Sequence, residues 1–385
     1  MTTTGFILRN ALRNKRRLIL TIASVAVSLF LFTTLQTALK IMTQPPTTEQ
    51  AALRIVVRHR VSLANLIPIR YRYRIEQIEG VEYCSAFTWF GGIYQDESKS
   101  NFAQFACDPD RIFHIFTDID VAPNHLDAFR KERTACIVGK KLLERFGWKI
   151  GDRITLTQGI FPCDAELIIR GVYTPKTNAE FDETILFFRH DYFDELLNKF
   201  SQVGTFWIKV RTAEDVPRLI EQIDASFRNT SAETKTETER AFQLGFISMF
   251  GNIKLFLGSI CTVIVFTMLL VSASTMSMAI RERAREIAIL KALGYNGSHI
   301  FGLILAESLG LAVTGGLIGC VGAKLFYSNV DIYKLSQGNI PFFPVDADVI
   351  AIGLLVALLL GVVSALAPAW SSARTTVVEG LRTLD

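Results

Sequence analysis

Long stretches without a charged side chain constrain this sequence more than any other feature. Residues 18–39, 255–280 and 349–373 contain no Asp, Glu, Lys or Arg, and most of their side chains are apolar. The hydrocarbon core of a bilayer is about 30 Å thick, and roughly 20 helical residues cross it. The three stretches therefore predict transmembrane helices at 18–43, 254–280 and 349–373.

A fourth transmembrane helix is predicted at 300–326. Its apolar run is interrupted only by Glu307 and ends near Lys324. The first helix, 18–43, is predicted to be retained rather than cleaved as a secretory signal. Its apolar region exceeds the roughly 7–15 residues of a signal, and no convincing small-x-small cleavage site follows it.

Basic residues near the helix ends predict the orientation. The N-terminal segment 1–17 and the connection 281–299 are rich in Lys and Arg, and the tail 374–385 adds Arg374 and Arg382, whereas the short loop 327–348 contains three aspartates. Lys and Arg are enriched on the cytoplasmic side of membranes, so both termini and the connection are predicted to be cytoplasmic. This bias accounts for the net charge of +4 and gives no reason to invoke nucleic acid.

The segment 1–17 mixes apolar and basic residues. This pattern predicts a short amphipathic helix lying on anionic lipid headgroups; a disordered basic tail is the alternative.

The predicted orientation places residues 44–230 outside, as one large α+β extracytoplasmic domain. Its two ends, 44–95 and 200–230, each contain strand-like runs followed by helix-like runs, which predicts an α/β lobe. Residues 96–199 contain a short helix that leads through glycines into strands, which predicts a β-rich inserted lobe.

Residues 231–253 contain no proline and lead directly into the second transmembrane helix. A continuous helix over this segment would form a stiff stalk between the domain and the membrane. The alternative is a flexible linker, which the Thr and Ser residues at 230–238 favour.

Four of the six cysteines lie in the extracytoplasmic domain: Cys84, Cys107, Cys136 and Cys163. An oxidising compartment would allow them to pair, and four free buried thiols are an equal alternative. The other two, Cys261 and Cys320, lie in predicted membrane helices as small packing residues.

Several chemistries lack support in the sequence. No G-x-x-x-x-G-K-[ST] phosphate-binding loop occurs, so the chain is not expected to hydrolyse ATP on its own. The five histidines lack metal-ligand spacing, and no G-x-S-x-G nucleophile motif is present. We therefore expect no catalytic residues, no metal and no cofactor in this chain.

The connection 281–299 is longer than a turn between membrane helices requires. It reads RERAREIAILKALGYNGSH, charged at its start and apolar afterwards, with Gly294 and Asn296–Gly297 as helix stop signals. A short helix of this kind is suited to docking into a groove of a partner protein; a solvated turn is the alternative.

These residues resemble those of a known family. RERAREIAILKALG is similar to the signature of the FtsX-like permeases, the ABC transporter family that includes MacB, LolC and LolE. ILAESLGLAVTGGLIG and APAWSSARTTVVEGLR resemble the family's third helix and its C-terminal motif, with Val377 in place of the usual proline. NALRNKRRLILTIASVAVS resembles its opening, and CIVGKKLLERFGWKIGDRITL resembles the MacB-like periplasmic core domain.

The resemblance implies a non-catalytic permease subunit in a bacterial inner membrane. A separate cytoplasmic ATPase dimer, which binds the ATP and Mg²⁺, would dock on 281–297 as the coupling helix. The residues expected to carry this docking are Arg285, Glu286, Ile289, Leu290, Leu293 and Gly294. A second or homologous permease would pair with this one, and a periplasmic adaptor and an outer-membrane channel are open further partners.

The implied function is coupling of ATP hydrolysis to movement of the outer domain, for export or extraction of a lipoprotein, peptide, lipid or drug. The alternative is an FtsX-like signalling scaffold that activates an extracytoplasmic partner such as a cell-wall hydrolase.

Two features of the third membrane helix carry open alternatives. Gly315 and Gly319 form a G-x-x-x-G that permits close helix approach, either within one chain or in a dimer. Glu307 is an intramembrane carboxylate, and such groups are candidates for function. It serves either in transport or as an anchor for basic residues near the coupling helix.

Overall fold

The computed structural model describes residues 15–43, 50–96, 102–176, 181–249, 251–330, 332–336 and 343–374. The chain divides into two compact units. The membrane unit comprises residues 1–43, 251–331 and 343–385, and the inter-helix domain comprises 44–250 and 332–342. The predicted amphipathic segment up to residue 14 and the tail beyond Arg374 lie outside the described residues.

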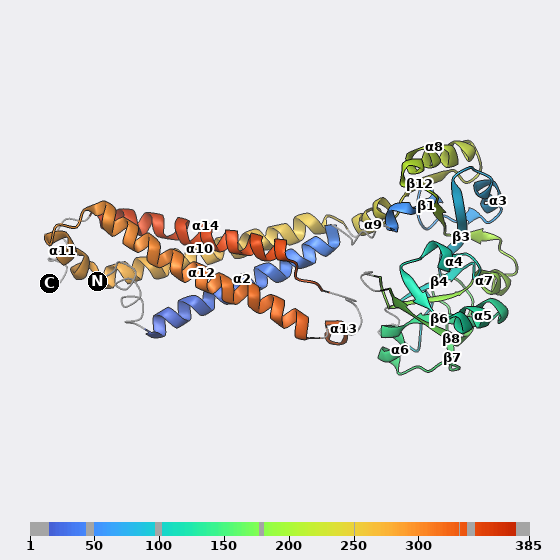
Figure 1. The fold of residues 1–385 in the computed structure, drawn as a ribbon, viewed down its shortest axis with the longest axis horizontal. Coiled ribbons are helices and arrows are strands. Elements are labelled where there is room, and N and C mark those ends of the chain that lie inside the picture. Colours follow the sequence, from blue (N-terminus) through green and yellow to red (C-terminus); the bar gives the residue numbers. More distant parts are fainter. Residues whose placement is uncertain are drawn as a thin grey trace. The chain divides into compact units, whose positions relative to one another are not determined.

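The membrane unit contains the four predicted apolar helices (Figure 1). They are α2 (Lys15–Thr43), α10 (Ile253–Glu282), α12 (Gly297–Asn329) and α14 (Ala347–Arg374). Among the described residues these four are long and apolar enough to cross a membrane. A short helix, α11 (Ala284–Ala292), joins α10 to α12.

The glycines of α12 lie in tight helix–helix contacts. A Cβ atom added to Gly315 would approach the side chain of Val25 to 2.7 Å, and one added to Gly319 would overlap the carbonyl oxygen of Ala26. Both glycines therefore face α2 of the same chain. Of the two predicted roles for this G-x-x-x-G, packing within one chain is the one observed.

The inter-helix domain combines helices with mostly antiparallel strands. Before residue 100 its elements are η2 (Ala51–Leu53), β1 (Arg54–His59), β2 (Ile67–Pro68), α3 (Tyr71–Glu76) and β3 (Val81–Trp89). The middle contains β4 (Ala103–Cys107), α4 (Ile112–Ile115), β5 (Ile119–Val121), α5 (Pro123–Lys131), β6 (Ala135–Gly139), α6 (Lys140–Phe146), β7 (Arg153–Leu156), β8 (Ala165–Pro175), β9 (Ile185–Arg189) and α7 (His190–Leu196). The last part contains β10 (Gln202–Val203), β11 (Thr205–Val210), η3 (Ala213–Asp215), α8 (Val216–Ser226), β12 (Thr234–Thr238) and α9 (Glu239–Ser248), and the separate helix α13 (Ile332–Leu335) also belongs to this unit.

One sheet runs through the whole domain. Its strand order is β12-β1-β11-β3-β4-β9-β6-β8-β5, with β7 beside β8; the β4–β9 and β6–β8 pairs are parallel, and the other pairs among the described strands are antiparallel. The predicted lobes 44–95 with 200–230 and 96–199 are therefore joined through the pairing of β3 with β4. The insertion also contributes four helices, so it is less purely β than predicted.

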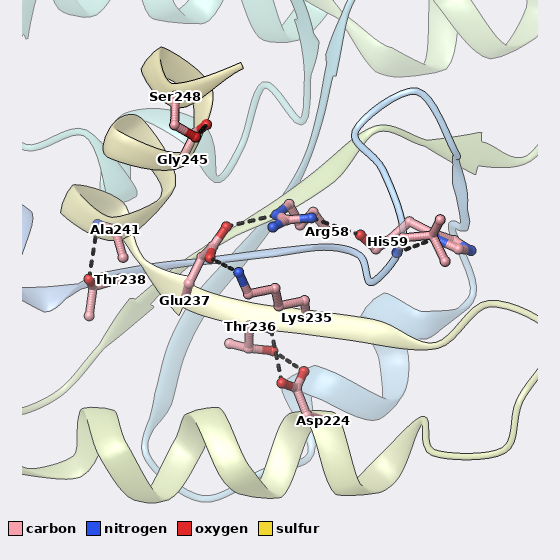
Figure 2. Close-up of polar contacts among 11 residues, drawn as sticks. Arg58, His59, Asp224, Lys235, Thr236, Glu237, Thr238, Ala241, Gly245 and Ser248 are labelled. Atoms are coloured by element: carbon pink, nitrogen blue, oxygen red, sulfur yellow. Dashed lines mark hydrogen bonds and ion pairs between the residues drawn. The ribbon is translucent and has the colours of Figure 1, made fainter. Parts of the chain in front are cut away.

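The predicted stalk helix over 231–253 is wrong in its first part. Residues 234–238 form β12, an edge strand paired with β1, because its alternating threonines suit a half-buried strand. Figure 2 shows Asp224 of α8 accepting hydrogen bonds from Thr236 on this strand. Helix begins only at α9, and Gly251, with φ +84°, separates α9 from α10.

All six cysteines are free thiols. Cys84, Cys107 and Cys136 are buried, and this burial raises the pKa of each thiol well above its ordinary value. Of the two alternatives for the cysteines of the domain, the structure contains the unpaired one.

Candidate coupling site between the second and third long helices

The connection after α10 forms a separate short helix because the backbone leaves helical geometry on both sides of it. Arg283, which caps α10, has φ −106° and ψ 11°. At the other end Gly294 has φ +97°, a conformation that side chains with a Cβ rarely adopt. Asn296 then adopts an extended conformation as the N-cap of α12. The predicted stop signals therefore end α11 as expected.

One face of α11 is exposed. Arg285, Ile289 and Leu293 follow one another at i, i+4 spacing and share this face. Ile289 is 48% exposed and Leu293 is 72% exposed. Two large apolar side chains beside a basic one form a surface that a partner protein can cover. We call these three residues the α11 docking face.

The opposite face of α11 is seated on the membrane helices. Ala288 is 3% exposed, and Ile287 packs on a buried cluster that includes Met276, Ile300 and Ile304. A cavity of about 310 Å³ lies beside this contact, lined by Met276, Ala279, Ile280, Arg283, Glu286, Ile287, Ile289, Leu290, Ile300, Leu303, Ile304 and Glu307. Its walls are mainly apolar.

An ion pair connects the start of the 281–299 connection to α12. Nη1 of Arg283 lies 2.7 Å from Oε2 of Glu307, and both side chains are largely buried. A carboxylate inside an apolar helix is costly unless it is paired. Of the two predicted roles for Glu307, the structure contains the contact with a basic residue near the connection.

Two hydrogen bonds connect α11 to α14. The ammonium group of Lys291 donates hydrogen bonds to the carbonyl oxygens of Ser372 and Ala373, at 3.0 and 2.9 Å. Carbonyl groups in the last turn of a helix lack intrahelical partners, and a cation there also interacts favourably with the helix dipole. Gly297 lies close by, since a Cβ added to it would be 3.0 Å from the oxygen of Ala373.

The predicted site residues therefore fall into three groups. Arg285, Ile289 and Leu293 form the exposed docking face, and Gly294 ends the segment. Glu286, Leu290 and Glu307 line the cavity on the inner side, which Ile289 also borders. Gly315 and Gly319 lie elsewhere, in the contact of α12 with α2.

Sequence reasoning missed Lys291 as a contact residue. In the sequence, Lys291 contributed only a positive charge near a membrane helix. Its hydrogen-bond partners are backbone carbonyl groups, and because every residue has one, the sequence does not indicate which of them Lys291 contacts. Among the described residues no group of three or more His, Cys, Asp and Glu side chains could hold a metal ion.

Two family models match this chain. The MacB-like periplasmic core domain matches residues 18–226, and the FtsX-like permease C-terminal model matches residues 258–377. The second match includes the whole connection between α10 and α12.

Curated relatives carry related descriptions. The chain is 24% identical to an uncharacterized ABC transporter permease, MJ1507, of Methanocaldococcus jannaschii, over 80% of this chain and 77% of that protein. It is 23% identical to the uncharacterized permease protein Rv0987 of Mycobacterium tuberculosis, over 67% of this chain and 30% of the relative. It is 28% identical to the macrolide export ATP-binding/permease protein MacB of Nitrobacter winogradskyi, over 40% of this chain and 22% of the relative. The chain thus spans less than a third of the last two relatives.

Solved structures of similar proteins cover about half of the chain. The periplasmic region of MacB from Actinobacillus actinomycetemcomitans has 9% sequence identity and a TM-score of 0.38, over 50% of this chain and 92% of that one. The extracellular domain of YknZ from Gram-positive bacteria has 12% identity and a TM-score of 0.36, over 48% of this chain and 99% of that one.

Proposed function

Because this chain belongs to the FtsX-like ABC transporter permeases and carries a MacB-like periplasmic core domain, we propose that it works as the permease subunit of a transporter whose ATPase is a separate protein. The ATPase docks on the α11 docking face. The observation that carries this proposal is the exposure of Ile289 and Leu293 on a helix whose other face is seated on the membrane helices.

The contacts of Arg283 and Lys291 with neighbouring helices support a role of α11 in transmitting movement. Arg283 connects the segment to α12 through Glu307, and Lys291 connects it to α14. A displacement of α11 by a docked ATPase therefore acts on α12 and α14 directly, as well as on α10 through the chain. The ion pair of Arg283 and the hydrogen bonds of Lys291 hold α11 against the membrane helices.

The proposed orientation places α11 in the cytoplasm and the inter-helix domain outside a bacterial inner membrane. α2 and α10 are consecutive spans on either side of that domain, so the start of α2 and α11 lie on one side of the membrane. Both are rich in Lys and Arg, which favours the cytoplasm for them. At the other end of α2, Lys40 forms ion pairs of 2.6 and 2.8 Å with Asp346 and Asp348.

We further propose that a second permease, identical or homologous, completes the membrane part. In the apolar window of α10 only 11% of residues are buried within this chain, against 39% for α12 and for α14. α10 is thus the span with the most surface left for a neighbouring helix. The exported or extracted substrate is proposed to be a lipoprotein, peptide, lipid or drug on the outer side.

The test is retention of the ATPase during purification. Leu293→Asp places a carboxylate in the proposed apolar contact, and burying an unpaired charge there costs at least about 3 kcal/mol. Each 1.4 kcal/mol is a factor of about ten in affinity, so retention of the ATPase should fall about a hundredfold. Mass spectrometry of the proteins purified with the tagged permease measures this.

The matched control is Leu335→Asp, since Leu335 is 67% exposed but lies in the inter-helix domain. It should leave retention of the ATPase unchanged. Leu290→Asp is the less specific variant, because Leu290 lines the inner cavity and the change also disturbs the seat of α11. If Leu293→Asp retains as much ATPase as the parent chain, α11 is not the docking site.

A further inference from the structure

Three charged side chains meet inside the inter-helix domain. Arg54 is 2% exposed, Asp118 is 5% exposed and Glu239 is 6% exposed. Nε of Arg54 donates to Oε2 of Glu239 at 2.5 Å, and its Nη1 donates to Oδ2 of Asp118. The guanidinium carbon also lies 5.2 Å from the ring centroid of Phe116, within cation–π range. The proposed docking on α11 gives none of these groups a role.

The three residues come from distant places in the chain. Arg54 is the first residue of β1, directly after η2 and on the chain that follows the first membrane helix. Glu239 is the first residue of α9, the last helix before the second membrane helix. Asp118 lies between α4 and β5, in the middle part of the domain. The cluster therefore joins both segments that connect the domain to the membrane.

Three further contacts fix the first half of α9, and that of Phe242 reaches the sheet of the domain. The hydroxyl of Thr238 caps the helix by accepting from the backbone N–H of Ala241 at 3.3 Å. Gln243 donates to Oε1 of Glu239 at 3.1 Å, and the ring of Phe242 packs edge-on against Trp207 at 6.0 Å. The start of α9 is thus fixed by one buried carboxylate and one aromatic contact.

The chain beyond α9 has few contacts of this kind. Met249 is 65% exposed, and Gly251 has φ +84° with no atom within 4 Å of an added Cβ. α10 then begins with its own cap, because Oδ1 of Asn252 accepts from the backbone N–H of Leu255 at 3.1 Å. Two helices that each have their own cap and are separated by a left-handed glycine are separate elements.

We propose that Arg54 is a positioning residue that fastens α9 to β1, so that both connections to the membrane end on one rigid body. Movement of α10 then reaches the domain through α9, and Arg54 passes it to β1 and to Asp118 together. The inference holds whether or not an ATPase docks on α11.

An ion pair suits this role because breaking it is costly. Separating α9 from β1 would take the buried carboxylate of Glu239 away from Arg54 and leave that carboxylate without compensation. Burial raises the pKa of Glu239, and the nearby Arg54 opposes that rise. The pair is directional as well, since the guanidinium group offers its N–H donors in a fixed plane.

The experiment is hydrogen–deuterium exchange of the full-length protein in nanodiscs, without any ATPase. Glu239→Ala leaves Arg54 paired with Asp118, so the domain keeps a neutral pair and loses only the tie to α9. Amides of 241–248 should exchange about tenfold faster, whereas those of β3 and β11 should stay within about twofold of the parent. Glu239→Gln, which keeps an acceptor for Arg54, should restore most of the protection.

Glu237→Ala is the matched control. Glu237 lies two residues earlier, on β12, and pairs with Arg58 and Lys235 at 2.7 and 2.8 Å, as Figure 2 shows. Its loss removes a carboxylate near the start of α9 without touching the buried cluster. Exchange of 241–248 should therefore stay within about twofold of the parent in this variant.

Two results would overturn the proposal. These are unchanged exchange of α9 in Glu239→Ala and an equal acceleration of exchange throughout the domain. Neither of them bears on ATPase retention, so failure here is distinct from failure of the proposed docking.

Discussion

The guanidinium group of Arg283 lies 2.7 Å from the carboxylate of Glu307, and this pair joins the end of α10 to the interior of α12. Glu307 is ten residues beyond the first residue of α12, so it lies about 15 Å along the helix at 1.5 Å per residue. Arg283 is the residue at which the backbone leaves α10. The pair therefore explains both how a carboxylate is tolerated in an apolar span and how the connection is seated.

Removing either partner should destabilise the protein. Glu307→Ala leaves Arg283 largely buried without its partner, and breaking a buried pair costs about 3–5 kcal/mol. The double variant Arg283→Ala with Glu307→Ala should lose less than the sum of the two single variants, because no charge is left alone. Thermal unfolding in detergent measures the three losses. Strictly additive losses would show that the two groups do not interact.

Glycine at position 319 should be required for the contact of α12 with α2. A Cβ there meets backbone atoms of Ala26 and Phe30, which move only with the helix. Gly319→Ala should therefore cost about 1–3 kcal/mol, as overpacking does. Gly322→Ala is the control, because nothing lies within 4 Å of its added Cβ and alanine favours helix by about 1 kcal/mol. Equal unfolding temperatures for the two variants would contradict this packing.

The membrane helices and many local elements could be predicted from the sequence. Uncharged runs of about 20 residues have few alternatives to a transmembrane helix. The order β6, α6 and β7 also follows from local signals, since Gly147 adopts φ +66° where α6 ends. Gly294 ends α11 in the same way, with φ +97°. In these cases one or two residues determine the backbone.

Contacts between distant residues could not be predicted. Arg54 and Glu239 are 185 positions apart, and a single sequence carries no sign of their pairing. The threonines of β12 favoured a flexible linker in the sequence, because the partner strand β1 and the acceptor Asp224 lie far away in sequence. Which residues of α11 are exposed could not be predicted either, since periodicity alone does not show which side of α11 the membrane helices cover.

The proposed orientation predicts which cysteines an impermeant thiol reagent reaches. In a variant without the six native cysteines, Ile160→Cys and Leu335→Cys should react in intact cells, because these side chains are 57% and 67% exposed in the outer domain. Asn296→Cys, beside α11, should react only after the membrane is opened. Labelling at 296 in intact cells would overturn the orientation based on Lys and Arg near the helix ends.

His190 is the buried histidine of the inter-helix domain. It is 2% exposed at the start of α7, and its Nε2 atom has no hydrogen-bond partner among the described residues. Burial lowers the pKa of His190, although the carboxylates of Asp108 and Asp194 oppose the effect. Burial therefore favours the neutral form of the ring in the folded protein.

The unfolded chain binds a proton at this histidine below pH about 6.5, whereas the folded protein does so only at lower pH. The unfolded state therefore binds more protons in that window, and stability falls as the pH falls below about 6.5. His190→Phe should lose less stability than the parent between pH 7.5 and 5.5, as measured by urea midpoints of the full chain in detergent. His114→Phe, at an exposed histidine, reports the effect of an aromatic substitution alone. If the His190 variant and the parent lose stability equally, the buried ring does not carry this pH dependence.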